Sequence, residues 1–290
     1  MSKLYYPGYQ TRVWNPFVGS DHGAAKGCLP KCWAAAMVRR WGDQWGIGNS
    51  FAPRLVEKWL RKPLSWRKPQ VVATGFMGDI ACLPPVQLAS VMATIQTARQ
   101  HTYLLLTKDP ERLRKNLLAY PRMPPNVILG ATVRNQEDAD ALIPALLRIP
   151  AARYWLSIEP LLGPIVRPKC PHCHGRKDRQ VEDSCYSGQA TCPDCGGTGA
   201  AWPLFDWAVI GSESGRGADW GGYETPGAGE PRTTVRHAVI AWTRSLVAQC
   251  RAAGVAVWVK QLPHYRDGKW RVSGELADFP ADLQVREKPF

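Results

Sequence analysis

Four cysteines within residues 167 to 202 have the spacing of a metal site. They form two CxxC pairs with 18 residues between the pairs: Cys170 with Cys173, and Cys192 with Cys195. Each CxxC turn directs two thiolates at one point, and two such turns complete a tetrahedral zinc site filled entirely by protein. We therefore predict a structural Zn²⁺ ion that holds this segment together and leaves no position for a reacting water. Weaker alternative ligands in the same segment are His172, His174 and Cys185.

A second pair of cysteines, Cys28 and Cys32, follows a glycine-rich loop and directly precedes an alanine-rich helical run, in GCLPKCWAAAMVRR. Three interpretations compete. A CxxxC spacing is poorer than CxxC for a redox pair, and no thioredoxin-like context lies beside it. The two thiols are otherwise small core residues, or they hold an iron–sulfur cluster, because loop-borne thiolates before a helix are the usual ligands of such clusters.

The positive charge of the chain is concentrated near its N-terminus. The chain has 290 residues and a net charge of +13. Residues 1 to 70 contain twelve Lys or Arg against three Asp or Glu, a net charge of +9, together with six of the thirteen Trp. Cations interleaved with flat rings that could stack on bases favour nucleic acid as a partner. The alternative is a solvated basic face with the Trp residues in the core.

No segment of the sequence predicts a membrane protein or a secreted one. No apolar run approaches the roughly 20 residues that span a bilayer, and the N-terminus has no apolar signal-peptide segment. We therefore expect a cytoplasmic protein with no membrane partner. In that compartment the nine cysteines are metal ligands or core residues more often than a disulfide framework.

Short apolar runs alternate with amphipathic stretches after the N-terminal region. Six runs are too short for helices and predict buried parallel strands: Val71–Met77, Tyr103–Thr107, Asn126–Thr132, Tyr154–Ile158, Trp207–Gly211 and Val255–Lys260. Helical patterns lie between several of them: Pro85–Arg99, Pro110–Leu118, Gln136–Leu147 and Arg236–Ala253. This alternation predicts an α/β fold, a parallel sheet with covering helices.

Polar side chains follow each predicted strand. They are Asp79 after the first strand, Thr107 and Lys108 after the second, Thr132, Arg134 and Asn135 after the third, Ser157 and Glu159 after the fourth, Ser212, Glu213 and Ser214 after the fifth, and Lys260 and Gln261 after the last. In a barrel of βα units the carboxyl ends of the strands converge, so six polar clusters predict one shared cleft. Taken singly, each is better explained as a helix cap or turn residue than as a functional one.

Seven motifs in order carry a resemblance to a known family. They are WNPFVG with the following CWAAAMVRR, then FMGD, LLLTKDPER, NVILGATVRNQEDAD, LSIEPLLGPI, DWAVIGSESG and the final QCRAAGVAVWVKQL. From about Trp14 to Leu262, apart from the four-cysteine segment, the chain resembles a phage and prophage family of unknown function. Members of that family are similar to radical S-adenosylmethionine enzymes and, more distantly, to spore photoproduct lyases.

The resemblance implies a partial (βα)6 TIM-like barrel whose N-terminal cysteine loop holds a 4Fe-4S cluster. In such enzymes three Cys bind three irons, and S-adenosylmethionine binds the fourth. One-electron transfer then gives a 5′-deoxyadenosyl radical that abstracts hydrogen from the substrate. The chemistry belongs to the cofactor, while the protein positions the substrate and excludes water. An electron donor such as flavodoxin or ferredoxin is implied as a partner.

This chain departs from the family pattern by one thiolate. When CWAAAMVRR is aligned with the usual CYA helix, Cys32 is the last cluster ligand and Cys28 the middle one, and the first falls near Ser20, where no Cys occurs. His22 could supply a nitrogen ligand, and Cys82 could also reach in. Otherwise the cluster is lost.

By resemblance, then, we expect a phage-type radical enzyme that modifies or isomerises a nucleobase in DNA, with hypermodified thymidine as one candidate. Glu159, Ser212 and Glu213 are expected to bind the polar parts of S-adenosylmethionine. The residues expected to face the substrate are Thr107, Lys108, Arg134, Lys260 and Gln261. The alternative is a cluster-free, zinc-containing protein that binds nucleic acid or a partner on a degenerate barrel.

The expected organisation has three segments. Residues 1–166 contain the cysteine loop and the first part of the barrel, residues 167–202 form a zinc-ribbon insertion, and residues 203–290 complete the barrel and the C-terminal tail. If the chain is phage-encoded, its compartment is the host cytoplasm.

Overall fold

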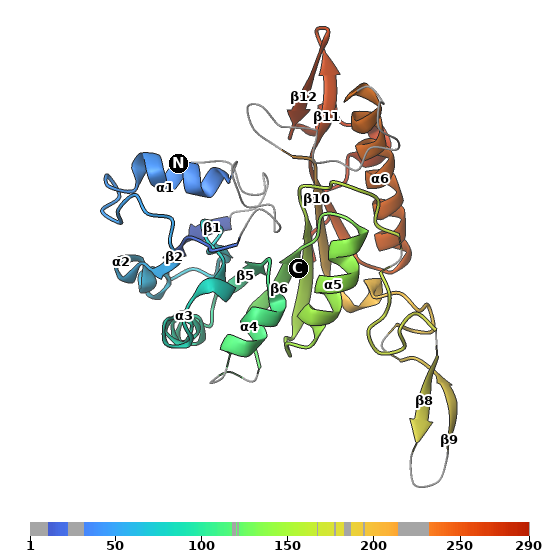
Figure 1. Ribbon diagram of the computed structural model, residues 1–290, viewed down its shortest axis with the longest axis horizontal. Helices are drawn as coiled ribbons and strands as arrows, with labels where there is room; N and C mark the ends of the chain where they lie inside the picture. The colour runs from blue at the N-terminus through green and yellow to red at the C-terminus, as the bar shows by residue number, and fades with distance from the viewer. Residues whose placement is uncertain are drawn as a thin grey trace. The chain divides into compact units, whose positions relative to one another are not determined.

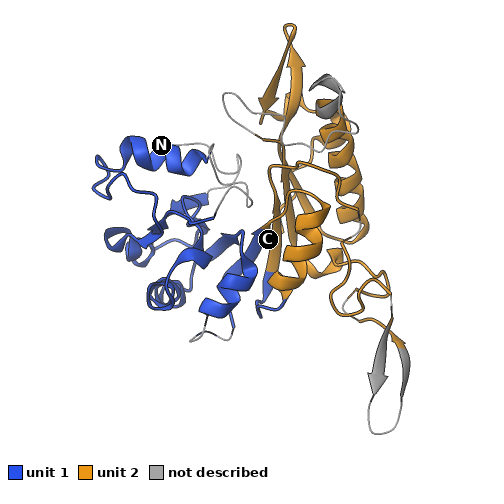
Figure 2. Cartoon of the chain, in the orientation of Figure 1, with its two compact units in different colours: residues 1–131, 148–153 blue, residues 132–147, 154–290 orange. Residues whose placement is uncertain are grey.

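The computed structural model describes residues 11–22, 32–117, 120, 122–166, 168–176, 178–182, 187–193, 195–213 and 232–289. The chain is a mixed α/β protein whose main strands are mostly parallel (Figure 1). It divides into two compact units: unit 1 is residues 1–131 with 148–153, and unit 2 is residues 132–147 with 154–290 (Figure 2). The expected α/β class is confirmed at this level. The partial barrel and the segment boundaries near residues 167 and 202 stay predictions.

Unit 1 is built on four parallel strands, in the order β1, β4, β5, β6. Their bounds are β1 Thr11–Trp14, β4 Val71–Thr74, β5 Thr102–Thr107 and β6 Val127–Thr132. Every residue of β6 is buried, which explains its unbroken apolar run, as in strands covered on both faces. The sequence did not predict β1, because Arg12 and Val13 in its middle are exposed.

Short helices and turns connect the strands of unit 1. The helices are α1 Trp33–Trp41, α2 Glu57–Leu60, α3 Pro85–Thr97 and α4 Pro110–Asn116. Two 3-10 turns, η2 Lys62–Ser65 and η3 Ile80–Cys82, and an antiparallel pair, β2 Phe17–Val18 with β3 Arg54–Leu55, complete the unit.

Proline and aspartate fix where the predicted helices of unit 1 begin. Pro85 and Pro110 occupy the first helical position, where the missing N–H has no helical partner to lose. The side chain of Asp109 accepts a hydrogen bond from the N–H of Arg112 at 3.2 Å and so caps α4. Both helices therefore start at the predicted residue.

Unit 2 has three parallel strands and one antiparallel strand, in the order β7, β10, β11, β12. Their bounds are β7 Arg153–Ile158, β10 Trp207–Gly211, β11 Ala256–Arg266 and β12 Lys269–Ser273. Its helices are α5 Gln136–Leu147 and α6 Arg232–Ala252, of which α6 packs along β10 and β11 (Figure 1). The 3-10 turns are η4 Trp202–Leu204, η6 Leu276–Asp278 and η7 Ala281–Leu283.

The strand β11 is longer than predicted because it forms a hairpin with β12. Asp267 and Gly268 connect the two strands and have φ angles of 51° and 72°. Two consecutive residues with positive φ are the signature of the tight turn that Asp-Gly favours between antiparallel strands. The hairpin therefore has a local cause that was present in the sequence.

Three tryptophans on adjacent strands form the centre of the core of unit 2. Trp155, Trp207 and Trp258 are each at most 1 % exposed. The ring centroids of Trp155 and Trp207 are 5.6 Å apart, and those of Trp207 and Trp258 are 6.5 Å apart with the rings edge to face. Aromatic pairs of this kind contribute about 0.5–1.5 kcal/mol each beyond the area that they bury.

The two ends of the four-cysteine segment lie side by side. The bridge between Lys169 and Ala200 is antiparallel, and the N–H of Ala201 donates to the carbonyl of Pro168 at 2.8 Å. Beyond the cysteines the segment forms a hairpin of β8 Asp178–Glu182 and β9 Ser187–Thr191. No helix among the described residues combines the length and apolarity needed to cross a membrane.

Candidate functional site

In unit 1, polar groups that follow β4 and β5 converge on the carboxylate of Asp79. Asp79 is 4 % exposed and accepts four hydrogen bonds. Its Oδ1 accepts from Thr107 Oγ1 at 2.7 Å and from the N–H of Ala81 at 2.9 Å. Its Oδ2 accepts from the N–H of Lys108 at 2.7 Å and from Nε2 of His22 at 2.8 Å. One carboxylate therefore ties together the segments after β2, β4 and β5.

The surroundings of Asp79 keep it ionised in spite of its burial. Burial alone opposes the charged form, but the hydrogen bond and charge of His22 and the bonds from Lys108 and Thr107 together lower the pKa of Asp79 below its usual value. A carboxylate that accepts several N–H and O–H bonds is stabilised as the anion. His22, 5 % exposed, is held in place by this anion.

Asp21, His22 and Cys82 bring an oxygen, a nitrogen and a sulfur donor together beside Asp79. Cys82 Sγ donates to Asp21 Oδ1 at 3.1 Å and lies 3.5 Å from His22 Nε2. The ligand atoms of the three residues all lie within 4.8 Å of one another, so the group could hold a metal ion. The sequence had suggested His22 and Cys82 as ligands, but Asp21 was missed although it directly precedes His22.

Asp21 and Cys82 have pKa values shifted in opposite directions. The side chain of Arg112 donates to Asp21 at 2.6 Å and lowers the pKa of Asp21 to about 2. Burial raises the pKa of Cys82 to about 12. Without a bound cation the pair is therefore a thiol that donates to a carboxylate.

The same contacts exclude a cysteine–histidine–aspartate relay of the kind found in thiol hydrolases. In such a relay the two nitrogens of the imidazole contact different partners. Here the single nitrogen Nε2 of His22 contacts both Asp79 and Cys82. The thiol is also not activated, because burial raises its pKa.

Of the two loop cysteines expected to hold the cluster, the structure describes only Cys32. Cys28 lies outside the described residues. Cys32 precedes α1, is half-buried and packs against an apolar cluster that includes Val18, Val38 and Met77. Within the described part of the chain, Cys32 does not belong to the group of Asp21, His22 and Cys82. Ser20 is half-buried and directly precedes this group.

In unit 2, Glu159, Lys260 and Gln261 form one hydrogen-bonded group at the ends of β7 and β10 and within β11. Lys260 Nζ donates to both carboxylate oxygens of Glu159, at 2.7 and 2.9 Å. Gln261 Nε2 donates to Glu159 Oε1 at 3.2 Å and to the carbonyl of Ser212 at 2.6 Å. Glu159 was expected to bind S-adenosylmethionine, and Lys260 and Gln261 were expected to face the substrate. The structure joins the three by hydrogen bonds.

Ser212 places an unused hydroxyl beside this group. Its side chain is fully buried, and its Oγ has no hydrogen-bond partner among the described residues. The site is tightly packed at Gly211, where a Cβ atom would lie 3.2 Å from Cγ of Gln261. Glu213 is the last described residue before the segment 214–231.

Other expected substrate residues have structural partners. Thr107 directs its hydroxyl at Asp79, and Lys108 contributes its backbone N–H to the same carboxylate. Arg134 forms an ion pair with Asp138, with contacts of 2.6 and 3.0 Å. Thr107 and Lys108 therefore position Asp79, which the sequence had noted only as a residue at a strand end.

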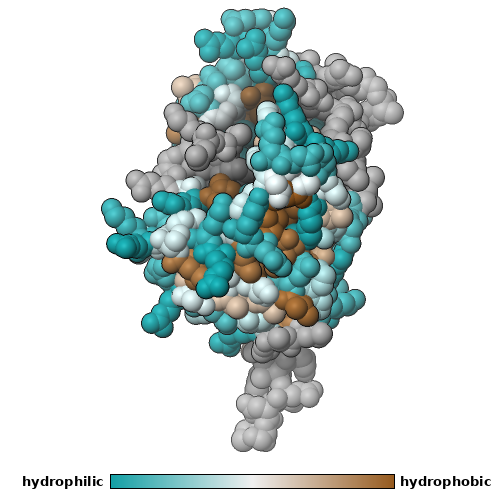
Figure 3. Space-filling view, turned by 90° about the vertical axis from the view of Figure 1, so that its left-hand side faces the viewer, coloured by the Kyte–Doolittle hydropathy of each residue, from teal (hydrophilic) through white to brown (hydrophobic). Residues whose placement is uncertain are grey.

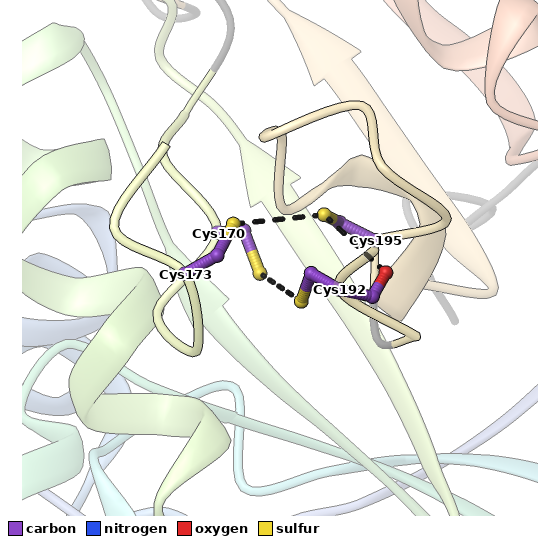
Figure 4. Close-up of side chains that lie close together, drawn as sticks. All are labelled: Cys170, Cys173, Cys192 and Cys195. Atoms are coloured by element: carbon purple, nitrogen blue, oxygen red, sulfur yellow. Dashed lines mark hydrogen bonds between the residues drawn. The ribbon is translucent and has the colours of Figure 1, made fainter. Parts of the chain in front are cut away.

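The four cysteines between residues 169 and 200 meet as predicted. All four side chains are buried, and Figure 4 shows their sulfurs turned toward one another. Two sulfur–sulfur distances are 3.9 Å, for Cys170 and Cys192, and 3.7 Å, for Cys173 and Cys195. A tetrahedral zinc ion with bonds of about 2.3 Å separates its sulfurs by about 3.8 Å. The residues present therefore fit a zinc ion.

The thiols of this group differ in acidity. Burial opposes ionisation of Cys195, but the N–H of Gly199 and the neighbouring thiols lower its pKa to about 7. Burial raises the pKa of Cys170 to about 12. His172 and His174 are exposed and lie outside this metal-ligand group, and Cys185 lies outside the described residues. Four Cys ligands leave no open position, so an ion here is structural.

Residues 8–220 match the model of a family described as Protein of unknown function (DUF5131). The matched region contains Asp79, Glu159 and the four-cysteine segment, while Lys260 and Gln261 lie beyond it. No curated protein and no solved structure matches the chain.

Proposed function

The chain belongs to the DUF5131 family, and on that premise we propose that it is a radical S-adenosylmethionine-type enzyme that modifies or isomerises a nucleobase in DNA. The ordered motifs from WNPFVG to VWVKQL support the proposal by their resemblance to such enzymes. Parallel strands with polar side chains at their carboxyl ends also support it, because this is where α/β enzymes bind their ligands. A partial barrel of the radical-enzyme type is part of the proposal.

The observation that carries the proposal is the convergence of His22 and Cys82 within one metal-ligand group. The family pattern requires three cluster ligands, and this chain has only Cys28 and Cys32 in its N-terminal loop, with Ser20 at the remaining position. Imidazole and thiolate are both known ligands of iron in iron–sulfur clusters. His22 directly precedes the segment that bears Cys28, so either His22 or Cys82 would complete the set.

The residues of unit 1 have distinct parts in this proposal. Cys28 and Cys32 would hold the 4Fe-4S cluster as thiolates, with His22 or Cys82 in the third position. When bound, the cluster supplies the electron that cleaves S-adenosylmethionine. Asp79 fixes the imidazole of His22. Cys82 would lose its proton to solvent on binding metal, because Asp21, with a pKa of about 2, is too weak a base to keep that proton.

The group in unit 2 would bind polar parts of the ligands. Glu159 is a carboxylate suited to an ammonium group, and Lys260 is a cation suited to a carboxylate or phosphate. Ser212 has a buried hydroxyl that a ligand could satisfy, because a buried polar atom without a partner is unfavourable. Glu213 is assigned to the same task by resemblance only.

Anaerobic purification with metal analysis tests the proposal. The expected result is a brown protein with about four iron and about four sulfide per chain. The reduced protein should cleave S-adenosylmethionine. Cys32→Ser should abolish both iron binding and cleavage. Of the variants His22→Ala and Cys82→Ser, the one that removes the third ligand should lose iron, while the buried Cys250→Ser serves as the control that keeps it.

A second candidate function is favoured by the four-cysteine site and by the packing of Cys32 against apolar side chains. It is a cluster-free, zinc-containing protein that binds nucleic acid or a partner protein. A colourless protein that contains zinc alone and does not cleave S-adenosylmethionine would contradict the enzyme and support this candidate. Cys170→Ser separates the two metals, since it should lose zinc and leave iron unchanged.

A further inference from the structure

A short segment of unit 1 displays cations on a fixed backbone. Residues 57–68, with the sequence EKWLRKPLSWRK, contain five Lys or Arg and one acidic residue, Glu57. We refer to them as the basic segment, which comprises α2, η2 and the residues up to Lys68. All five cations are exposed: Lys58, Arg61, Lys62, Arg67 and Lys68. The face of the molecule drawn in Figure 3, on the side where α1 and α2 lie in Figure 1, has hydrophilic side chains projecting over hydrophobic surface.

Most of these cations have no anionic partner in the protein. Within the described parts of the chain, no carboxylate lies within 4.0 Å of the charged groups of Arg61, Lys62, Arg67 or Lys68. By contrast, several arginines elsewhere are paired: Arg112, Arg114, Arg134, Arg148, Arg244 and Arg251. These four cations of the basic segment are therefore available to an external anion.

The backbone of the basic segment is anchored to the core. Nε1 of Trp14 donates to the carbonyl of Trp59 at 2.8 Å, and Nε2 of Gln100 donates to the carbonyl of Trp66 at 3.1 Å. The carbonyl of Pro63 lies 3.1 Å from Nε2 of the buried His101. These bonds hold the cations on an ordered scaffold, which reduces the entropy lost when they bind a ligand.

The tryptophans of the segment already have cations over their rings. Lys58 Nζ lies 5.5 Å and Lys62 Nζ 5.2 Å from the ring centroid of Trp59. The guanidinium of Arg12 lies 5.0 Å from the ring centroid of Trp66. Both rings are half-buried, so the groups that face outward are charged rather than aromatic. At Trp59 and Trp66, the aromatic surface that the sequence had suggested for stacking is therefore partly covered.

We propose that the basic segment binds the phosphate backbone of nucleic acid without reading its bases. Exposed, unpaired cations on an ordered backbone are complementary to a chain of phosphates, and contacts to phosphate carry no sequence information. The inference rests on the proposed function only in naming nucleic acid as the substrate class. Its consequence is that the protein docks DNA through charge, and base selection belongs to other residues.

The salt dependence of oligonucleotide binding tests the inference. The variant R61Q/K62Q/R67Q/K68Q is compared with wild type by fluorescence anisotropy, with a labelled single-stranded oligonucleotide and a duplex of equal length. If all four cations contact phosphate, the slope of log K against log salt should flatten by about 2.8 for the single strand and about 3.6 for the duplex. K115Q/K269Q removes exposed charges outside the segment and should leave the slope within about one of wild type.

A second variant separates charge from stacking. Trp33 on α1 is 50 % exposed, so its ring could stack on a base. Because the inference assigns binding to charge, Trp33→Ala should leave the affinity and the salt slope nearly unchanged. A loss of affinity in Trp33→Ala that exceeds the loss in the quadruple variant would overturn the inference. So would wild-type binding by the quadruple variant, or binding to vesicles of anionic lipid or to polyglutamate as tight as binding to DNA.

These measurements need neither reductant nor S-adenosylmethionine. A protein that lacks an iron cluster yet shows the expected salt slope would contradict the proposed enzyme and leave this inference standing. A protein that cleaves S-adenosylmethionine but binds DNA independently of the basic segment would do the reverse.

Discussion

Asp79 accepts hydrogen bonds from residues that are far apart in the sequence, and a single carboxylate therefore orders several loops of unit 1. His22 precedes it by 57 positions and Thr107 follows it by 28. Because it is buried and ionised, its donors depend on the negative charge as well as on the shape of the side chain. This dependence leads to two predictions at the scale of residues.

Replacing Asp79 by Asn should destabilise unit 1 strongly. The variant keeps the shape but loses the charge, and its amide N–H₂ must face at least one N–H or O–H donor. Breaking a buried charged pair in this way costs about 3–5 kcal/mol. The measurement is the free energy of unfolding in urea.

Thr107→Val is the matched control for Asp79→Asn. It removes one of the four bonds to the carboxylate and should cost about 1–3 kcal/mol. Equal losses for the two variants would show that the charge of Asp79 is unimportant.

The protein should lose stability in acid partly through Asp21. Arg112 lowers the pKa of Asp21 in the folded state to about 2, from an ordinary value of 3.8. A carboxyl group whose pKa is lowered by folding contributes stability above its unfolded pKa and loses it as the pH falls toward the folded one. This contribution should therefore disappear between about pH 4 and about pH 2. Asp21→Asn should unfold with a shallower pH dependence in that window, and an unchanged dependence would contradict the pairing.

At the scale of elements, the sequence predicted the features that depend on residues close together in the chain. The strands β5, β6, β7 and β10 appeared as apolar runs because buried parallel strands must be apolar. The edge strand β1 and the hairpin strand β12 were missed, since their residues are partly exposed and resemble loops. The four-cysteine site was predictable because each CxxC is local. The contact of His22 with Asp79 was not, because it depends on how separate segments pack.

Two glycines with similar backbone angles distinguish strain from crowding. Gly75, after β4, has a φ of 70°, and a Cβ atom there would lie 1.8 Å from Cζ of Phe17. Gly268, in the turn between β11 and β12, has a φ of 72°, and no atom lies within 4 Å of the same position. Both Ala variants bear the left-handed strain, about 1–2 kcal/mol.

Gly75→Ala should therefore destabilise the protein by a further 1–3 kcal/mol or so, because it also overpacks the site beside Phe17. Thermal or urea unfolding of the two variants in parallel measures the difference. Equal destabilisation would mean that Phe17 moves aside freely.

At the scale of the whole molecule, zinc should stabilise the four-cysteine segment and not the core of either unit. The four Cys ligands all lie between residues 169 and 200, and the cores of both units are built from other residues. Chelation of zinc, or Cys170→Ser, should open this segment to proteases and leave the far-ultraviolet circular dichroism largely intact. Acid should release the ion as well, since zinc binds thiolates and competes with protons. Global unfolding on chelation would contradict this division.

The two ends of the four-cysteine segment lie side by side, and this bears on whether the segment can be removed or exchanged. The hydrogen bond between Pro168 and Ala201 holds the two ends of the segment together, so a short connection would span the same gap. A segment of this kind can be gained or lost in one recombination event with little change in the packing of the rest of the chain. A chain in which a short turn replaces the residues between Pro168 and Ala201 should therefore fold into the same sheet.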